Sequence, residues 1–367
     1  MRFALNSCSR QPNSQACLPI QLSPTEFRIQ LSSLLWSQSD WDKHIGLRYP
    51  YSPNYGALQS MFRLDWLLLQ LFDQTENENA YLSLLFGRIP KNRDDALNIF
   101  NVSPDPSLKF GVIPLTSQVA KQNVRWVENR PVLRGYCWGT RDSAQTGNES
   151  DPLEHPDGNF KHLGEEWILG IPKYDPVTQQ RGAVQAYFLA NGDGALVQRA
   201  PVELVEDYNK FRGYAEIRNP GSCIGCHQQG LNQLDESQLV QTLKLGVPLN
   251  AATTHYGQLE NFHFSDLTTE ISRNNEDYKR FVTNGPERVL AVINAYDKPL
   301  NLSACAAELK TTSIELSRVI GSYPAVSARV AALTAGGTIS RDAWEQYYPT
   351  LRSIIDGKPV VIAPASK

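Results

Sequence analysis

One short run constrains this chain more than any other: Cys223-Ile224-Gly225-Cys226-His227. Two cysteines separated by two residues, with a histidine directly after the second, form the attachment signal for a c-type haem. The spacing lets both thiols reach the porphyrin vinyl groups as thioethers, and the adjacent imidazole then lies beneath the iron. The sequence therefore predicts one covalent haem c, with Cys223 and Cys226 as thioether donors and His227 as the proximal ligand.

Other roles for the two cysteines are less favoured by the sequence. A thioredoxin-type dithiol belongs beside a βαβ unit, and no parallel-strand pattern flanks the motif. Structural zinc needs two more ligands at short spacing, and His255, His263 and Cys305 are too scattered to supply them. A chance arrangement of buried thiols remains the non-haem alternative. Around the motif, Ser222 is suited to cap a short helix and Gly230 to end the turn after His227.

Length and composition bound the class of protein. The 367 residues are enough for two or three domains, and 41% hydrophobic with 20% charged residues is typical of a globular protein. A net charge of −3 gives no electrostatic footprint for nucleic acid or an anionic membrane. The longest apolar run, residues 64–72, is too short to span a bilayer and contains Asp65. We therefore expect no nucleic-acid partner, no transmembrane segment in this chain, and a redox partner protein that the sequence does not identify.

Thioether haem is normally attached outside the cytoplasm, which predicts export to the periplasm. The first residues, Met1 to Asn6, leave no room for the apolar region of a signal peptide, so we expect a segment upstream of Met1. Four cysteines remain outside the haem motif. In an oxidising compartment Cys8 and Cys17 are the favoured disulfide pair because they close a short loop, and free, partly buried thiols are the alternative.

The hydrophobic patterning predicts three regions: a mostly α region at residues 1–125, a β-containing haem-binding core at 126–250, and a helical region at 251–367. In the first region, residues 1–25 are expected to form a loop and residues 27–31 a short strand. Helices are expected at 36–47, 58–72, 80–86 and 93–101. The last region should hold helices at 267–281, 287–296, 303–309, 313–320, 326–333 and 342–355.

The middle region is different because β-branched and aromatic residues dominate it. Runs at residues 132–138, 166–171 and 183–189 are typical of strands, and the last two should form an antiparallel hairpin around a long turn at Pro172–Gly182. A second turn is expected at residues 191–194. The predicted fold class is α+β and mainly helical, with a central antiparallel hairpin and haem segment flanked by helical regions.

The sequence leaves the sixth ligand of the iron open. No methionine follows His227, and the only two in the chain are Met1 and Met61. His162, which precedes a strand, is the preferred distal ligand, and the alternatives are an open position or one of the side chains of Met61, His155, His255 and His263. Two axial imidazoles favour electron transfer, whereas an open face permits binding of peroxide, O₂ or NO. Arg134 and Arg141 are expected at the surface, with haem propionates or the distal side as the alternative.

Several segments, taken in order, resemble a group of large bacterial cytochrome-c-like proteins, in which a β-hairpin with a glycine- and glutamate-rich start precedes a Ser-Cys-x-x-Cys-His motif. These segments are Arg63 to Trp66, Gly135 to Trp138, His162 to Glu166, Gln185 to Ala190, Ser222 to His227, Leu300 to Leu309 and Gly336 to Asp342. The resemblance covers most of residues 26–357. It implies covalent haem, export to the periplasm and an additional N-terminal portion, but assigns no activity.

Two features depart from the group's pattern. The turn at Pro172–Gly182 is long where relatives have a tight one, and Leu163 stands where an acidic residue is usual, which weakens His162 as a ligand. The favoured function is electron transfer by a periplasmic monohaem cytochrome, with no catalytic residue assigned. The alternatives are a haem enzyme or a gas or redox sensor with an open, peroxidase-like distal site, and a non-haem interaction protein.

Overall fold

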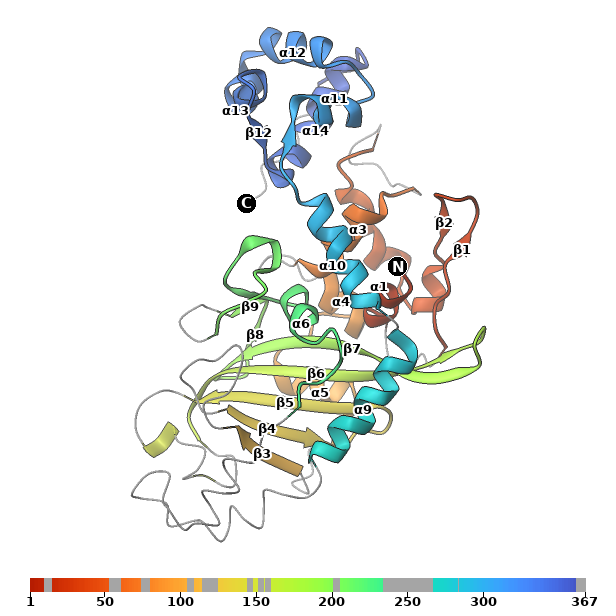
Figure 1. The fold of residues 1–367 in the computed structure, drawn as a ribbon, viewed down its shortest axis with the longest axis vertical. Helices are drawn as coiled ribbons and strands as arrows, with labels where there is room; N and C mark the ends of the chain where they lie inside the picture. Colours follow the sequence, from red (N-terminus) through yellow and green to blue (C-terminus); the bar gives the residue numbers. More distant parts are fainter. Residues whose placement is uncertain are drawn as a thin grey trace. The chain divides into compact units, whose positions relative to one another are not determined.

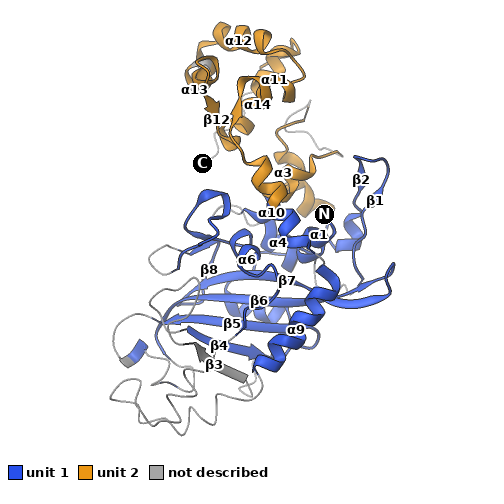
Figure 2. Ribbon diagram, viewed as in Figure 1, with its two compact units in different colours: residues 1–37, 70–290 blue, residues 38–69, 291–367 orange. Residues whose placement is uncertain are grey.

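The computed structural model describes residues 1–9, 15–52, 61–73, 80–103, 109–113, 125–143, 148–150, 155, 160–200, 205–233, 267–282 and 284–360. The chain forms two compact units (Figure 2): unit 1 comprises Met1–Ser37 and Gln70–Leu290, and unit 2 comprises Gln38–Leu69 and Ala291–Lys367. The predicted fold class, α+β and mainly helical, is confirmed. Within the described residues, no helix combines the length and apolar character needed to cross a bilayer.

Unit 1 is built on an antiparallel sheet with the strand order β3-β4-β5-β6-β7-β8 (Figure 1). The strands are β3 (Lys109–Ile113), β4 (Arg125–Arg130), β5 (Tyr136–Ser143), β6 (His162–Asp175), β7 (Gln180–Asn191) and β8 (Leu196–Val197). The predicted hairpin is confirmed as β6 and β7, and the predicted turn at residues 191–194 leads from β7 into β8.

The predicted long turn between β6 and β7 is wrong. Residues 172–175 pair with residues 180–183, so the turn contains only residues 176–179. Pro172 is tolerated in β6 because the pairing of β5 with β6 ends at Gly170 and the next bridge of β6 outside its hairpin is at Tyr174, with Gln15.

Helices cover both faces of this sheet. On one face, called the α6 face, lie α6 (Gly221–Cys226) and α9 (Leu267–Val282): Tyr187 of β7 stacks on His227, and α9 packs against β7. On the other, called the α5 face, lie α4 (Ala80–Phe86) and α5 (Arg93–Ile99), which contact Phe188 and Glu165. Figure 1 shows α9 lying across the strands. Because strand residues alternate between faces, neighbouring residues of β6 meet different helices.

Shorter elements complete unit 1: α1 (Arg2–Ser7), β1 (Ile20–Gln21), β2 (Phe27–Arg28), η1 (Leu31–Leu34), η3 (Asn148–Ser150), β9 (Arg199–Ala200), η4 (Phe211–Gly213) and β10 (Ile217–Arg218). Part of the predicted N-terminal loop is therefore the helix α1, whose apolar residues are buried. Cys8 and Cys17 are both buried and free, so the favoured disulfide is not formed in the structure. The Cys17 thiol instead accepts a hydrogen bond of 3.0 Å from the Ser33 hydroxyl.

Unit 2 is helical. It contains α2 (Gln38–His44), η2 (Gly46–Arg48), most of α3 (Leu64–Phe72), the end of α10 (Gly285–Tyr296), α11 (Leu302–Glu308), α12 (Ser313–Ser322), α13 (Pro324–Thr334), α14 (Arg341–Ile355) and the strand pair β11 (Leu300–Asn301) and β12 (Thr338–Ile339). The side chains of Asn301, Thr312 and Ser340 cap α11, α12 and α14 by accepting backbone N–H bonds. Their apolar faces meet in one core around Trp344 and Leu351.

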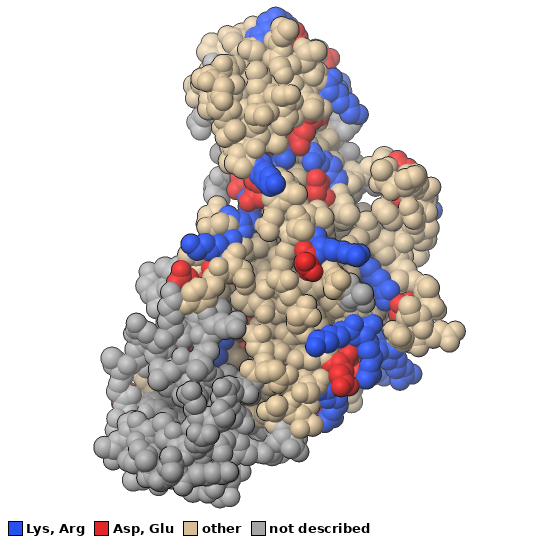
Figure 3. Space-filling model, viewed as in Figure 1, with Lys and Arg blue, Asp and Glu red and all other residues tan. Residues whose placement is uncertain are grey.

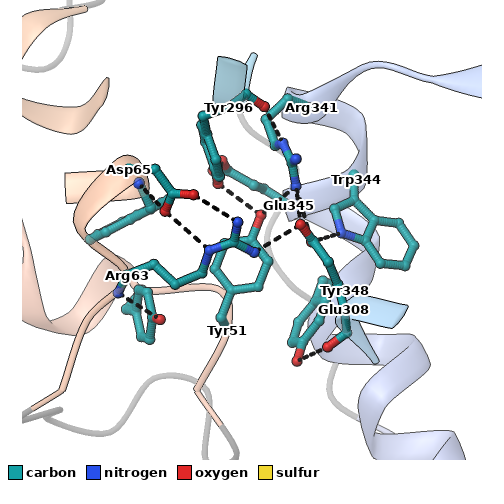
Figure 4. A network of polar contacts seen from close by, with 11 residues as sticks. Tyr51, Arg63, Asp65, Tyr296, Glu308, Arg341, Trp344, Glu345 and Tyr348 are labelled. Carbon is teal, nitrogen blue, oxygen red and sulfur yellow. Dashed lines mark hydrogen bonds and ion pairs between the residues drawn. The ribbon is translucent and has the colours of Figure 1, made fainter. Parts of the chain in front are cut away.

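A polar network joins the two sequence segments of unit 2 (Figure 4). The Glu308 carboxylate accepts hydrogen bonds from Arg63 at 2.8 Å, from Arg341 at 2.9 Å and from the Trp344 indole at 2.7 Å. This network places residues 38–69 with the C-terminal helices, while α9 packs on β7 in unit 1. The boundaries of the two compact units therefore differ from those of the predicted regions 1–125, 126–250 and 251–367.

Unit 2 should lose stability as the pH rises towards neutrality. Burial raises the pKa of Glu345 to about 7, although its hydrogen bond to the Tyr296 hydroxyl opposes this shift. The folded state then holds a proton that the unfolded chain releases near its ordinary pKa of about 4.3. Stability is fully present below that value and falls, by roughly 3 to 4 kcal/mol, up to about pH 7. Urea unfolding between pH 4 and 8 should show this slope in the wild type and not in Glu345→Gln; equal slopes would contradict it.

Candidate functional site

The predicted haem motif comprises the last four residues of the short helix α6 and the residue directly after it, His227. The helix follows β10, and the Ser222 hydroxyl accepts the backbone N–H of Arg218 at 2.9 Å. Ser222 therefore lies inside the helix and holds the preceding strand, whereas the N-cap position is Pro220. This differs from the predicted capping role because the approach to α6 comes from a strand that needs its own hydrogen-bond acceptor.

A buried ion cluster fixes the approach to α6. Asp73 accepts hydrogen bonds from Arg218, at 3.2 Å to each carboxylate oxygen, and from Arg212 of η4. Its carboxylate is nearly covered, so these charge-assisted bonds strongly favour one geometry for the loop. The strand and the helix that carries the cysteines are thus anchored to the end of α3.

The His227 imidazole has one fixed nitrogen. Its Nδ1 donates to the Gly230 carbonyl at 3.1 Å, and the side chain is 7% exposed. A bond of this kind makes Nε2 the unprotonated nitrogen of the neutral ring, which is the state that a metal-binding histidine requires. Gly230 has φ +107°, and an added Cβ would lie 2.2 Å from the Asn275 side chain, so the predicted stop at this glycine is confirmed and only glycine fits.

Asn275 of α9 clamps the segment that holds His227. Its side chain accepts the Leu231 N–H at 2.6 Å and donates to the Leu231 carbonyl at 2.8 Å. Asn275→Ala leaves both buried groups unpaired and should lower the free energy of unfolding by about 2 kcal/mol. The Leu231 amide should also exchange faster with deuterium. Arg273→Ala, an exposed position on the same helix, is the control; indistinguishable behaviour of the two variants would contradict the clamp.

The two thiols are free and protonated. Cys223 is 2% exposed and Cys226 is half-buried, where it accepts a hydrogen bond of 3.6 Å from the Asn209 amide. Burial raises the pKa of Cys223 well above its ordinary value and that of Cys226 to about 12, and the nearby charge of Glu166 acts in the same direction. Nucleophilic redox cysteines need the opposite shift, so the structure does not favour dithiol exchange chemistry.

Glu166 of β6 is the residue that the sequence did not single out. Its Oε1 lies 3.7 Å from Nε2 of His227. Its Oε2 lies 3.6 Å from Nη1 of Arg125, which Asp142 holds through two bonds of 2.8 and 3.0 Å. Burial alone would raise the pKa of Glu166, but the charges of a protonated His227 ring and of Arg125 hold it at about 2. The site is therefore an ionised carboxylate facing the motif.

The structure does not bring His162 to His227. Nε2 of His162 lies 2.7 Å from Oε1 of Glu165 and its Nδ1 lies 3.2 Å from the Phe160 carbonyl. Glu165 also binds Arg93 of α5, so His162 lies on the α5 face, opposite His227. Both of its ring nitrogens are engaged there.

The remaining candidates lie in other places. Met61 belongs to unit 2 and is 70% exposed, and His155 is half-buried. His255 and His263 lie outside the described residues. Arg134 is exposed, as expected, while Arg141 is half-buried on the α5 face beside Glu128 and Glu165.

The chemistry of the donor set fits a covalent haem. Cys223 and Cys226 are free thiols one helical turn apart, and His227 presents an Nε2 whose other nitrogen is tied to a backbone carbonyl. The distance of 3.7 Å from Nε2 to the nearest Glu166 oxygen is longer than a hydrogen bond, so that nitrogen has no strong partner there. Among the described residues, no group of three His, Cys, Asp or Glu side chains is arranged as a ready-made site for a bare metal ion.

A scan against protein-family models, a search of curated proteins and a search of solved structures each found no match for this chain. The reading of the site therefore depends on its own residues.

Proposed function

We propose that the chain is a monohaem c-type cytochrome that transfers electrons. Haem c would be bound through Cys223 and Cys226, and His227 would be the proximal ligand. The observation that carries this proposal is the His227 ring, whose Nδ1 bonds the Gly230 carbonyl directly after a helical turn with two free thiols. The bound group supplies a one-electron couple at the iron. The chain's own residues fix the imidazole and surround it with a buried shell.

The same proposal implies maturation outside the cytoplasm, in the periplasm, and a redox partner protein. On the face drawn in Figure 3, basic and acidic side chains of the described residues occur side by side. A partner whose surface carries charge of mainly one sign would therefore gain little electrostatic steering from that face. The resemblance to bacterial cytochrome-c-like proteins supports this reading through the motif and the hairpin.

The test is to export the full chain, behind a cleavable secretion signal, from bacteria that carry cytochrome c maturation machinery. After denaturation, the intact mass should exceed that of the polypeptide by one haem. Recovery of only the unmodified chain, from cells in which a known c-type cytochrome is loaded, would overturn the proposal.

A haem enzyme or gas sensor with an open distal site is the second candidate. It is favoured by the position of His162, whose ring lies on the α5 face and so leaves the predicted second imidazole out of the site. Turnover of peroxide by the haem-loaded protein would favour this candidate over electron transfer. Reversible one-electron reduction without such turnover would favour the carrier.

His162→Ala should leave the absorption spectrum of the haem-loaded protein unchanged. The reason is that the His162 ring bonds Glu165 and Phe160 on the face opposite His227. His227→Ala provides the comparison and should remove the proximal ligand, with a shift of the ferric bands. A conversion to high spin in His162→Ala would reinstate it as the distal ligand.

A further inference from the structure

The Nε2 atom of His227 faces one carboxylate. Oε1 of Glu166, on the central strand β6, lies 3.7 Å away. The imidazole is the group that would bind the iron, so the Glu166 carboxylate faces the nitrogen at which the iron would be bound.

Bond lengths indicate what Glu166 does there. Zinc sites serve as a guide to such lengths: zinc lies about 2.0–2.1 Å from an imidazole nitrogen and about 2.0–2.2 Å from a carboxylate oxygen. Their sum, about 4.1 Å, is close to the 3.7 Å between the two atoms. We propose that Glu166 is the second axial ligand of the iron held by His227. This inference rests on the haem attachment proposed above and deepens it.

The surroundings hold the carboxylate in place. One oxygen faces His227, and the other lies 3.6 Å from Arg125. Asp142 grips Arg125 through two hydrogen bonds and is itself buried. Strand β6 is paired on both sides at Glu166, with Thr140 and with Leu189. The ligand is thus carried on a rigid strand rather than on a loop, and Arg125 keeps it oriented.

The neighbouring glutamate makes the assignment specific. Glu165 points to the α5 face, where it binds His162, Arg93 and Trp167. Its carboxylate is fully buried there and occupied by these donors. Adjacent residues of identical chemistry thus lie on opposite faces of one sheet, and Glu166 is the one that faces His227.

A carboxylate ligand has consequences that differ from those of histidine or methionine. An anionic oxygen is a hard ligand and stabilises the higher charge of ferric iron over ferrous iron. The ferric protein should therefore be high-spin or mixed-spin, and its reduction potential should be low. Reduction weakens the bond to the carboxylate, which leaves the ferrous iron able to bind CO.

The experiment compares haem-loaded wild type with Glu166→Gln and Glu166→His, and uses Glu165→Gln as the matched control. Glu166→Gln should change the ferric electron paramagnetic resonance spectrum. It should also raise the ferrous-to-ferric ratio at a fixed ambient potential roughly tenfold. Glu166→His should give a low-spin spectrum and slow CO binding, a gain that misfolded protein cannot show. Folded Glu165→Gln should keep the wild-type spectrum.

The outcomes separate the two proposals. Absence of covalent haem from the wild type would sink the proposed function itself. Covalent haem whose ferric spectrum and reduction are the same in wild type, Glu166→Gln and Glu166→His would overturn only the ligand assignment. In that case Glu166 would be a structural partner of His227.

Discussion

Exported protein in which Cys223 and Cys226 are both replaced by serine should contain no covalently bound haem. The reason is that each thioether bond needs a cysteine sulfur, and the double variant has none left in α6. The two thiols of α6 are the sulfurs that the structure places directly before His227. Each single variant should retain one thioether and show displaced absorption bands. The measurement is the intact mass after denaturation, together with haem staining of the denatured chain.

Cys305→Ser is the control for this experiment. Cys305 is a buried free thiol in the core of unit 2, so its loss should not change haem content. Covalent haem in the double variant, or loss of haem in Cys305→Ser, would contradict attachment at residues 223 and 226.

Glu308→Gln should destabilise unit 2 by about 3 kcal/mol. The carboxylate of Glu308 neutralises Arg341, whose side chain is 4% exposed, and Arg63. An amide of the same shape leaves the Arg341 guanidinium without its counter-charge in the interior, whereas Arg63 keeps its ion pair with Asp65. The value lies at the low end of the range for broken buried pairs because the Arg63 side chain is 32% exposed and partly solvated. Urea unfolding followed by tryptophan fluorescence measures it.

Glu315→Gln is the matched control because Glu315 also pairs with an arginine of unit 2, Arg318. Both side chains of that pair are exposed, so solvent screens them, and no change in the unfolding curve is expected. Equal stability of Glu308→Gln and wild type would show that the network contributes nothing net.

The helices were the most predictable part of the fold. α14 was predicted at residues 342–355 and is Arg341–Ile355, and α12 was predicted at residues 313–320 and is Ser313–Ser322. The period of their apolar residues marks one buried face, and capping side chains mark where each begins. Such signals are local, so the sequence carries them in full.

Strand β4 was missed for a physical reason. Arg125 and Glu128 are buried in it, but Asp142 pairs the first and Arg130 and Arg141 pair the second. A strand that buries charges in ion pairs lacks the apolar alternation by which strands are recognised. Arg141 and Asp142 belong to the next strand, β5, and spacing along the sequence does not reveal that they pair with β4.

Part of the candidate site was likewise predictable from the sequence, and part was not. The run from Cys223 to His227 was found because its chemistry depends on spacing within five residues. The sequence suggested a histidine, Met61 or an open position opposite His227, whereas the side chain that faces it is Glu166. Period-two alternation predicts that Glu165 and Glu166 point to opposite faces, but only the three-dimensional position of α6 decides which of them meets His227.

The clamp on Leu231 sets an order of events. Asn275 follows Leu231 by 44 residues in the chain. In the proposed function the chain is exported with its N-terminus first, so residues 223–231 reach the new compartment before Asn275 does. During that interval the imidazole and both sulfurs would be accessible for attachment of the haem. Docking of α9 would then close the segment over the finished centre.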